Sequence, residues 1–424
     1  MQRICRWIGV VFLIIGLVLA GEIRQEQIKF ESSIPKEEEA KNKKIRVLIK
    51  NNDFQGIVHN KIEIFAEHGL ILKTEKGEER IKGGTIVALD DTSDVLSEGK
   101  VAICSEKEND SIVLAHLHRA CGTPSYEGSL EVYAVKEGLV IVNELDIESY
   151  LEQVVPSEMP SSYELEALKA QAVCARSYAY RQIQDVAYPE YHAHVDDSTS
   201  FQVYANSRKT SRTSNAVKET AGETVQYQGK IAATYFFSTS SGVTTSMEAW
   251  DMKNEDEYPY LKDIKITDPE GKVYEEDLPW YRWEITMEKN ELKEALEEYS
   301  GKRIGLLKEI DISQRGKSGI VLRIEVVGTE GELVVEKENK IREAFGDSRF
   351  VVRRKDGSEV SCTDLLPSAF FTIKEEGYSY IIEGGGHGHG IGMSQNGANE
   401  MAKEGKKYAD ILQFFYPGTN IVSL

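Results

Sequence analysis

One glutamate in the middle of the chain has the clearest potential for chemistry. Glu158 lies between Pro156 and Pro160 in the stretch VVPSEMP. Proline fixes φ and biases the residue before it toward extended backbone, so residues 157–159 are predicted to form a rigid turn that enters the following helix. A carboxylate held in this way can serve as a general acid or base. The alternative interpretation is a helix-entry acid that interacts only with the helix dipole.

A glycine-rich segment near the C-terminus, EGGGHGHGIGMSQNG (383–397), is the second candidate. Glycine permits positive φ and close approach of the backbone to a ligand. Three interpretations of His387 and His389 stay open: polar recognition of a substrate, structural hydrogen bonding, and a metal site that would need further ligands. If the loop faces Glu158, at least one imidazole is expected to be neutral. Activity should then fall as the pH drops through the usual histidine range of about 6 to 7.

Two other polar stretches are weaker candidates. His192, His194, Asp196 and Asp197 could hold a metal, but solvated loops often have this composition. The stretch YFFSTSSGVTTSMEAWD (235–251) lacks the G-x-S-x-G pattern of a serine nucleophile and is predicted to be a hydroxyl-rich loop that closes a polar cleft.

The elements around these candidates predict an α+β fold, because strands and helices do not alternate regularly. Residues 45–146 form an expected β-rich part. A helix at 161–183 is expected to begin with a capping box of Ser161 and Glu164. The core at 147–424 is expected to contain an inserted α/β region at about 255–350. Further expected elements are a helix near 211–221, a helix near 289–299, three strands in 306–338, a short helix near 338–345 and a last helix at 394–404.

The N-terminus and the charge bear on the location and partners of the protein. After Arg3 and Arg6 come 15 apolar residues from Trp7 to Gly21, fewer than the roughly 20 of a comfortable membrane span. Residues 1–21 are therefore predicted to be a signal peptide or a retained membrane anchor, and residues 22–44 a charged linker. A net charge of −19 on 424 residues argues against a nucleic-acid partner. A Cys104–Cys121 disulfide is an open possibility.

Five stretches together resemble the stage II sporulation protein D / LytB family, over roughly residues 45–424. They occur in the order and spacing of that family, and the glutamate of V-P-S-E-M-P with the later G-H-G-x-G-M-S-Q-x-G-A is the most specific part. The stretches are NELDIESYLEQVVPSEMPSSYELEALKAQAVCARSYA, SFQVY, YFFSTSSGVTTSMEAWD, YPYLKDIK and GGGHGHGIGMSQNGANEMAKEGKKYADILQFFYPGT.

The resemblance implies an exported, usually plasma-membrane-anchored protein that faces the cell wall and acts on peptidoglycan. Sporulation members of the family are lytic transglycosylases that cleave glycan strands already stripped of stem peptides by a partner amidase. The LytB branch implies a different role, a non-catalytic wall-binding protein that enhances an amidase. The matching positions make Glu158 the catalytic acid/base, with no cofactor. The expected substrate-binding residues are Arg176, Ser240, Tyr260, Lys262, His387, His389 and Gln395.

One departure concerns metal binding. Sporulation members often carry cysteines before Q-V-Y that can bind zinc, whereas this chain has DDSTSF, with Asp196 and Phe201 at those places. No metal is therefore expected, and the loop is predicted to be held by packing.

A lytic transglycosylase can work with one carboxylate, because the C6 hydroxyl of muramic acid replaces water. An ordinary glycosidase needs two. Since the dipole at a helix N-terminus lowers a carboxyl pKa, a partly apolar pocket is expected to raise the pKa of Glu158, and Arg176 is expected to point elsewhere.

Overall fold

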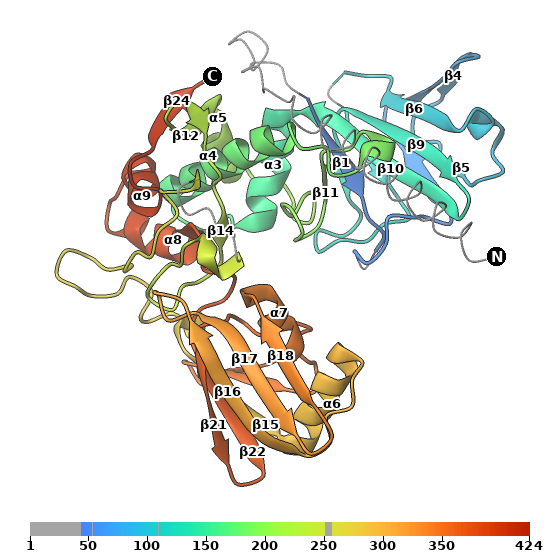
Figure 1. Ribbon diagram of the computed structural model, residues 1–424. Coiled ribbons are helices and arrows are strands. Elements are labelled where there is room, and N and C mark those ends of the chain that lie inside the picture. Colours follow the sequence, from blue (N-terminus) through green and yellow to red (C-terminus); the bar gives the residue numbers. More distant parts are fainter. Residues whose placement is uncertain (1–43, 53, 109, 251–256) are drawn as a thin grey trace, which may run out of the picture. The chain divides into compact units, whose positions relative to one another are not determined.

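The computed structural model describes residues 44–52, 54–108, 110–250 and 257–424 (Figure 1). The chain divides into two units, Met1–Asn42 and Lys43–Leu424, and the account below concerns the second. The predicted export segment and nearly all of the charged linker lie outside the described residues. Within the described ranges, no helix is both long and apolar enough to cross a membrane.

The fold is α+β, as predicted, and begins with two antiparallel sheets. The larger has the strand order β11-β1-β10-β9-β6-β3-β4, and the smaller has the order β5-β2-β7-β8. Only β11 runs parallel to its neighbour, β1, and this pairing attaches the loop after residue 194 to the sheet. The bounds are β1 Lys44–Ile49, β2 Ile62–Phe65, β3 Leu70–Thr74, β4 Gly77–Ile81, β5 Val87–Leu89, β6 Lys100–Ser105, β7 Ile112–Leu114, β8 Ser125–Tyr126, β9 Ser129–Val135, β10 Gly138–Asp146 and β11 Val195–Asp196.

A group of helices follows, with α4 at its centre. Helix α4 packs against α3, α5, α8 and α9, and most of its side chains are buried (Figure 1). Its run of Ala, Val and Cys residues permits this close packing on several sides. The bounds are α3 Ile147–Glu158, α4 Leu165–Gln182, α5 Ser211–Glu219, α8 Gln395–Lys403 and α9 Tyr408–Phe415.

Three sequence predictions about these helices are wrong. Glu158 does not lie in a turn that enters a helix but is the last residue of α3, an unpredicted helix that contains Pro156. Burial of the apolar face of α3 outweighs the hydrogen bond that the proline removes. Helix α4 begins at Leu165, and its N-cap, Glu164, makes no side-chain capping bond. Helix α8 is not the last, because α9 and a strand follow it.

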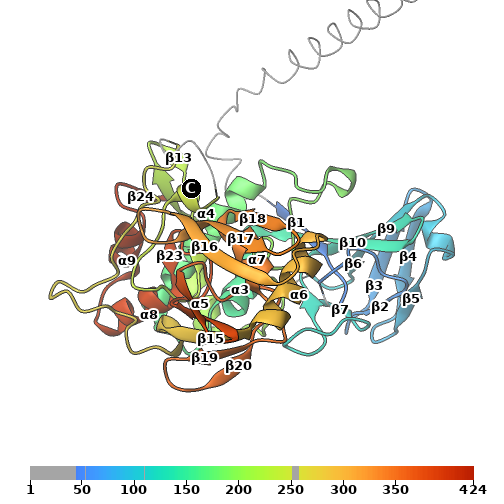
Figure 2. The same ribbon diagram turned by 60° about the horizontal axis from the view of Figure 1, so that its bottom comes forward.

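Residues 283–382 contribute a second, separate hydrophobic core. A five-stranded sheet has the order β20-β19-β15-β22-β21, and a three-stranded sheet has the order β16-β17-β18 (Figure 2). The predicted helices near 289–299 and 338–345 and the three strands within 306–338 are present. The bounds are β15 Trp283–Glu288, α6 Lys289–Ser300, β16 Leu307–Arg315, β17 Val321–Gly328, β18 Glu332–Glu336, α7 Glu338–Phe345, β19 Val351–Arg354, β20 Glu359–Ser361, β21 Phe371–Glu376 and β22 Ser379–Gly384.

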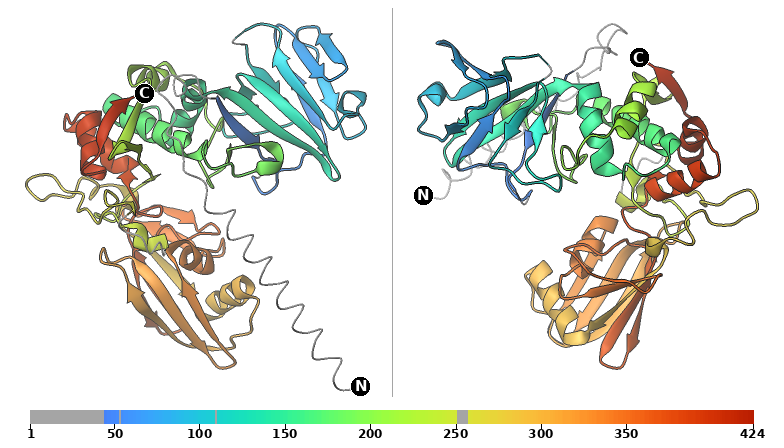
Figure 3. Two further views of the ribbon diagram at one scale, coloured as in Figure 1. Left: turned by 45° about the horizontal axis from the view of Figure 1, so that its top comes forward. Right: turned by 180° about the vertical axis from the view of Figure 1, so that it is seen from behind.

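Short strands tie the end of the chain to its middle. Strand β24 (Asn420–Ser423) pairs with β12 (Glu223–Tyr227), which also pairs with β13 (Lys230–Ile231) (Figure 3). Strand β14 (Phe236–Phe237) pairs in parallel with β23 (Met393–Ser394), and this pairing leads directly into α8. Single-turn 3-10 helices span Asp94–Leu96, Pro189–Tyr191, Met247–Trp250 and Pro279–Tyr281.

Candidate functional site

The Glu158 carboxyl group lies at the C-terminal end of α3 and is half-buried. The backbone N–H of Val203 donates a 2.6 Å hydrogen bond to its Oε1. Burial raises the pKa of the carboxyl to about 7, although the hydrogen bonds from Val203 and Gln395 act to lower it. A carboxyl group with a pKa near neutral can both give and take a proton at physiological pH. Burial thus raises the pKa of Glu158, whereas the apolar pocket expected around it stays a prediction.

The Val203 amide is held in place by the residue before it. The buried Gln202 donates from its side-chain amide to the carbonyl oxygen of Ala175 in α4, at 3.4 Å. The hydroxyl of Tyr150 in α3 donates to Oε1 of Gln202, at 3.3 Å. The Q-V-Y stretch is thus attached to both helices that flank Glu158, and this fixes the direction of the Val203 N–H.

Gln395 brings the C-terminal motif to Glu158. As the first residue of α8, it donates from Nε2 to the carbonyl oxygen of Glu158 at 3.2 Å and to Oε1 of Gln171 at 3.4 Å. Gln395 and Glu158 are separated by 237 positions in the sequence. The structure therefore brings together two of the predicted site residues, Glu158 and Gln395.

His389 is part of the framework of the glycine-rich loop. Its Nδ1 accepts from the N–H of Ile391 at 3.1 Å, and its Nε2 lies 2.9 Å from the carbonyl oxygen of Phe236. This pattern requires the neutral tautomer with the proton on Nε2. Both ring nitrogens are used within the protein, which favours the structural interpretation of this histidine. The substrate contact of His389 stays a prediction.

His387 is placed differently. Its backbone exchanges two hydrogen bonds with Thr239, and its ring lies 4.6 Å from the ring of Trp280 between centroids. Within the part of the chain that the structure describes, its ring nitrogens make no hydrogen bond, so they can receive a ligand. Burial lowers the pKa of both His387 and His389 to about 4. Both imidazoles are therefore neutral at pH 6 to 7, in line with the expectation of a neutral imidazole. Because they do not gain a proton in this range, they give no reason for activity to fall there.

We expect His389→Ala to lower the free energy of unfolding by about 1–3 kcal/mol, because a buried N–H and a buried carbonyl lose their partner. Denaturant unfolding measures the loss. His387→Ala is the matched control and should change stability less, because its ring makes no such bonds. An unchanged midpoint for His389→Ala, together with weaker glycan binding, would restore the ligand role.

Ser240 marks a second buried carboxyl group that the sequence analysis missed. The N–H of Ser240 donates to Oε1 of Glu275 at 3.0 Å, and its hydroxyl donates to Oε2. The hydroxyl of Ser394, the N-cap of α8, donates to Glu275 Oε1 at 2.7 Å. Burial raises the pKa of Glu275 to about 7. Since the Glu275 side chain is fully buried and hydrogen bonded, it joins Ser240 to the start of α8. Ser240 is therefore a framework residue.

Glu275 should make the protein less stable as the pH rises. Its native pKa is above the ordinary glutamate value of 4.5, so its stabilising effect is complete below that value and is lost as the pH rises through about 7. Glu275→Gln should therefore weaken the decline in stability between about pH 5 and 8. Unfolding measured across this range tests the prediction, with Glu276→Gln as the control. Equal slopes for wild type and Glu275→Gln would contradict it.

Arg176 does not point at Glu158 or at a ligand. Its fully buried guanidinium forms a bidentate pair with Glu148, with both bonds at 2.7 Å, and donates to the carbonyl oxygens of Val217 and Glu223. These contacts indicate a structural role for Arg176, and its predicted part in substrate binding stays a prediction. Its guanidinium joins α3, α4 and α5.

Tyr260 and Lys262 lie apart from the carboxylate. The hydroxyl of the buried Tyr260 accepts from the N–H of Ala233 at 2.8 Å, which indicates a structural contact. Lys262 is exposed at the edge of a separate cavity that Ser246 and Tyr258 also line. Its role in binding substrate stays a prediction.

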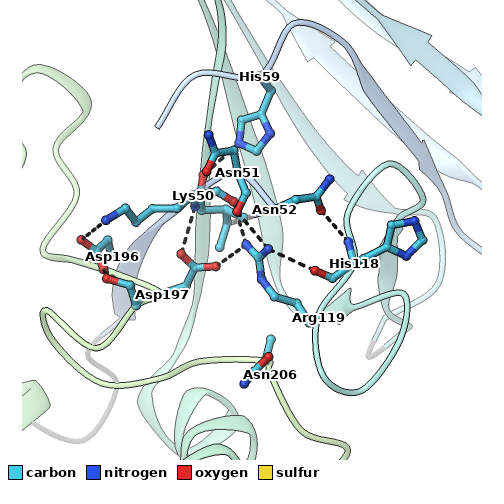
Figure 4. Close-up of polar contacts among 12 residues, drawn as sticks. Lys50, Asn51, Asn52, His59, His118, Arg119, Asp196, Asp197 and Asn206 are labelled. Atoms are coloured by element: carbon cyan, nitrogen blue, oxygen red, sulfur yellow. Dashed lines mark hydrogen bonds and ion pairs between the residues drawn. The ribbon is translucent and has the colours of Figure 1, made fainter. Parts of the chain in front are cut away.

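The loop with Asp196 and Asp197 is held by polar contacts, not by packing alone (Figure 4). The guanidinium of Arg119 pairs with Asp197 at 2.8 Å, and both side chains are fully buried. The N–H of Lys50 donates to the same carboxylate at 2.9 Å. Asp196 accepts from Tyr188 at 2.7 Å and from Ser198. The prediction that packing holds this loop is therefore corrected: a buried ion pair and hydrogen bonds hold it as well. Among the described residues, no three or more His, Cys, Asp or Glu side chains are arranged to hold a metal ion.

Sequence reasoning missed the groups on α4 that face the site. Burial raises the pKa of Tyr178, and the charge of Glu158 adds to this effect. Gln171 is fully buried, and its Nε2 finds no partner within the described part of the chain. Positions 171 and 178 are seven apart and so share one helix face, which is a signal that the sequence offered. Cys104 and Cys121 are both free, so they form no disulfide.

The structure is thus an α+β protein in which residues distant in sequence contact one half-buried glutamate, Glu158, whose pKa burial raises. A family model described as stage II sporulation protein matches residues 135–227, and a domain of unknown function matches residues 241–392. Stage II sporulation protein D of Bacillus subtilis is 31% identical over 295 residues, which cover 66% of this chain and 75% of that protein. The chain therefore belongs to the stage II sporulation protein D family.

Two further relatives widen the comparison. An uncharacterized protein of Brachyspira hyodysenteriae is 33% identical over 299 residues, 70% of this chain and 72% of that protein. The amidase enhancer of Bacillus subtilis is 30% identical over 304 residues, 64% of this chain but only 40% of that longer protein. The resemblance found in the sequence is thus confirmed at the level of the family.

Proposed function

We propose that the chain cleaves peptidoglycan glycan strands as a lytic transglycosylase and leaves 1,6-anhydro ends. The observation that carries the proposal is the Glu158 carboxyl group, which is half-buried, oriented by the Val203 amide and has a pKa of about 7. At neutral pH such a group is present in both protonation states. It can therefore act first as an acid and then as a base in one catalytic cycle.

The reaction would proceed as follows on the bond between N-acetylmuramic acid and N-acetylglucosamine. Protonated Glu158 donates its proton to the glycosidic oxygen while the bond from that oxygen to C1 of muramic acid breaks. The C6 hydroxyl of the same muramic acid then attacks C1, and the Glu158 carboxylate accepts the hydroxyl proton. Both transfers involve oxygens close together, so an acid in a fixed position serves both.

The surroundings of Glu158 favour a mechanism with one carboxylate. Ordinary glycosidases use two carboxyl groups that flank the bond. The other high-pKa glutamate nearby in the fold, Glu275, is fully buried and hydrogen bonded to Ser240 and Ser394. It is therefore not placed to contact a substrate. This supports Glu158 as the acid and base, with the intramolecular C6 hydroxyl as the nucleophile.

Mass spectrometry of the reaction products tests the proposal. The full chain is incubated with purified glycan strands from which stem peptides have been removed. We expect fragments 18 Da lighter at the muramic acid end than hydrolysis products, because no water is added. Hydrolysed ends would instead indicate a glycosidase, and intact strands would contradict enzymatic cleavage.

The second candidate function is that of a non-catalytic wall protein that enhances an amidase. The 30% identity to the amidase enhancer of Bacillus subtilis favours this possibility. The two functions differ in their dependence on Glu158. If Glu158→Gln enhances an added wall amidase as well as the wild type does, and neither protein produces anhydro ends, the enhancer role is supported.

We also propose export, with the protein facing the cell wall and held at the plasma membrane by residues 1–21, or secreted if this segment is cleaved. The basic and apolar pattern of that segment supports the proposal. The family relationship supports a sporulation role and a partner amidase that strips stem peptides before the glycan is cut. Fractionation of cells that express the full chain, followed by N-terminal sequencing of the protein, would separate anchoring from cleavage.

A further inference from the structure

A basic cavity lies in the region matched by the domain of unknown function. Its volume is ≈ 700 Å³, and neither Glu158 nor Gln395 lines it. The chain as a whole carries a net charge of −19, so a concentration of positive charge is unexpected here. The charged side chains around the cavity are Arg282, Arg315, Arg353, Arg354, Lys355, Glu284 and Glu383.

The register of the five-stranded sheet explains why several of these side chains meet. Arg353 in β19 lies opposite Glu284 in β15, and Glu284 lies opposite Glu383 in β22. Thr372 in β21 lies opposite Glu383. Side chains directly opposite one another in antiparallel strands point to the same face. These four side chains therefore form a row across four strands, and this row is one side of the cavity.

Backbone carbonyl oxygens orient two of the cavity arginines. The guanidinium of Arg315 donates to the carbonyl oxygens of Gly319 and Phe371, both at 2.9 Å. Arg282 donates to the Ser241 carbonyl at 3.0 Å, and its guanidinium lies 3.8 Å from the ring centroid of Tyr281.

Arg354 is also oriented by neighbouring side chains, whereas Arg353 is placed by its position in β19 opposite Glu284. Arg354 bonds the Ser358 hydroxyl and lies over the ring of Trp280. Within the described ranges, none of Arg282, Arg315, Arg353 and Arg354 has a carboxylate within ion-pair distance. A guanidinium oriented in this way offers its remaining N–H groups to an anion.

The cavity reaches the first residues of the glycine-rich segment. Gly384 and Gly385 line it, and the next residue, Gly386, donates from its N–H to the Trp280 carbonyl at 2.8 Å. His387, with its unbonded ring nitrogens, follows directly. The cavity thus ends where the glycine-rich segment begins.

We propose that this cavity binds the carboxylate groups of an acidic glycan strand. Arginine pairs with carboxylates through two parallel hydrogen bonds, and the half-buried ring of Phe370 at the cavity offers an apolar face for a sugar. Glu284 and Glu383 reduce the positive charge, and the whole chain is acidic, so widely spaced single charges fit better than a dense row of phosphates. The choice of a glycan rests on the proposed function, whereas the anion site itself does not.

The test measures binding of peptide-free glycan strands to the full chain in a Glu158→Gln background, which prevents cutting of the probe. One probe has free lactyl carboxylates, and a second has these groups coupled to methylamine and is therefore neutral. We expect Arg315→Gln/Arg353→Gln to weaken binding of the first probe roughly tenfold. The second probe should bind both proteins equally weakly. Lys302→Gln/Arg303→Gln is the matched control, since it removes two exposed charges of the same region that do not line the cavity.

Three outcomes would overturn the proposal. These are equal affinity for the two probes, equal affinity of the arginine variant and the control, and tighter arginine-dependent binding of a poly(glycerol phosphate) chain. Thermal unfolding of each variant shows whether the fold is kept, and Arg353→Gln alone serves if the double variant unfolds. If the wild type cuts no glycan while arginine-dependent binding persists, the proposed function fails and the anion site stands.

Discussion

Glu158→Gln should lower the rate of glycan cleavage by at least about 100-fold while substrate still binds, because the amide keeps the shape but cannot transfer a proton. The Val203 N–H can still donate to the amide oxygen, so the loop after β11 should keep its place. Initial rates on peptide-free strands, followed by the appearance of anhydro ends, provide the measurement. Substrate affinity measured separately distinguishes lost chemistry from lost binding.

Glu152→Gln is the matched control for this variant. Glu152 lies in the same helix but contacts Lys209 and Lys218 at its surface. It should keep near-normal turnover. Wild-type activity should also fall as the pH rises above about 7, since the acid form of Glu158 is then lost. Retention of more than a tenth of the wild-type rate by Glu158→Gln would remove Glu158 as the acid and base.

Arg119→Met should destabilise the protein by roughly 3–5 kcal/mol, because it leaves Asp197 buried without its cation. Arg119 and Asp197 are both fully buried, and Figure 4 shows the guanidinium between Asp197 and backbone carbonyls. Nη2 also donates to the Lys50 carbonyl at 2.7 Å, and Nη1 donates to the Asn51 carbonyl at 3.0 Å. Denaturant unfolding of the full chain measures the loss.

The pH dependence of stability and a second substitution show whether the buried charge of Asp197 causes the loss in Arg119→Met. Burial already raises the pKa of Asp197 to about 6. Without Arg119 this pKa should rise further, so the variant should be relatively more stable at pH 5 than at pH 8. Arg119→Met/Asp197→Asn should recover part of the loss, since a neutral amide replaces the buried anion and still accepts from Lys50. Arg80→Met, at an exposed ion pair with Glu106, should have little effect. A loss in Arg119→Met that does not vary with pH would contradict this account.

Local sequence determined most of the elements and singled out Glu158 as a candidate. Alternating β-branched residues predicted the strands before residue 146, and periodic apolar residues predicted the helices near 289–299 and 338–345. The two prolines beside Glu158 predicted a rigid turn at residues 157–159, whereas Glu158 is the last residue of helix α3. Local patterns do not report how much apolar surface a helix buries, and for α3 burial outweighed the proline.

Only the tertiary structure decided what surrounds the acid and which histidine is available. Burial raises the pKa of Glu158, and the hydrogen bond to its carboxyl group from Val203, 45 positions away, acts to lower it. His387 and His389 are equivalent in the sequence, yet only His389 meets a carbonyl and an N–H at bonding distance. The buried Glu275 and the arginines of the cavity gave no local signal either. Desolvation and hydrogen-bond pairing depend on contacts between distant segments, so the chain must fold before these properties exist.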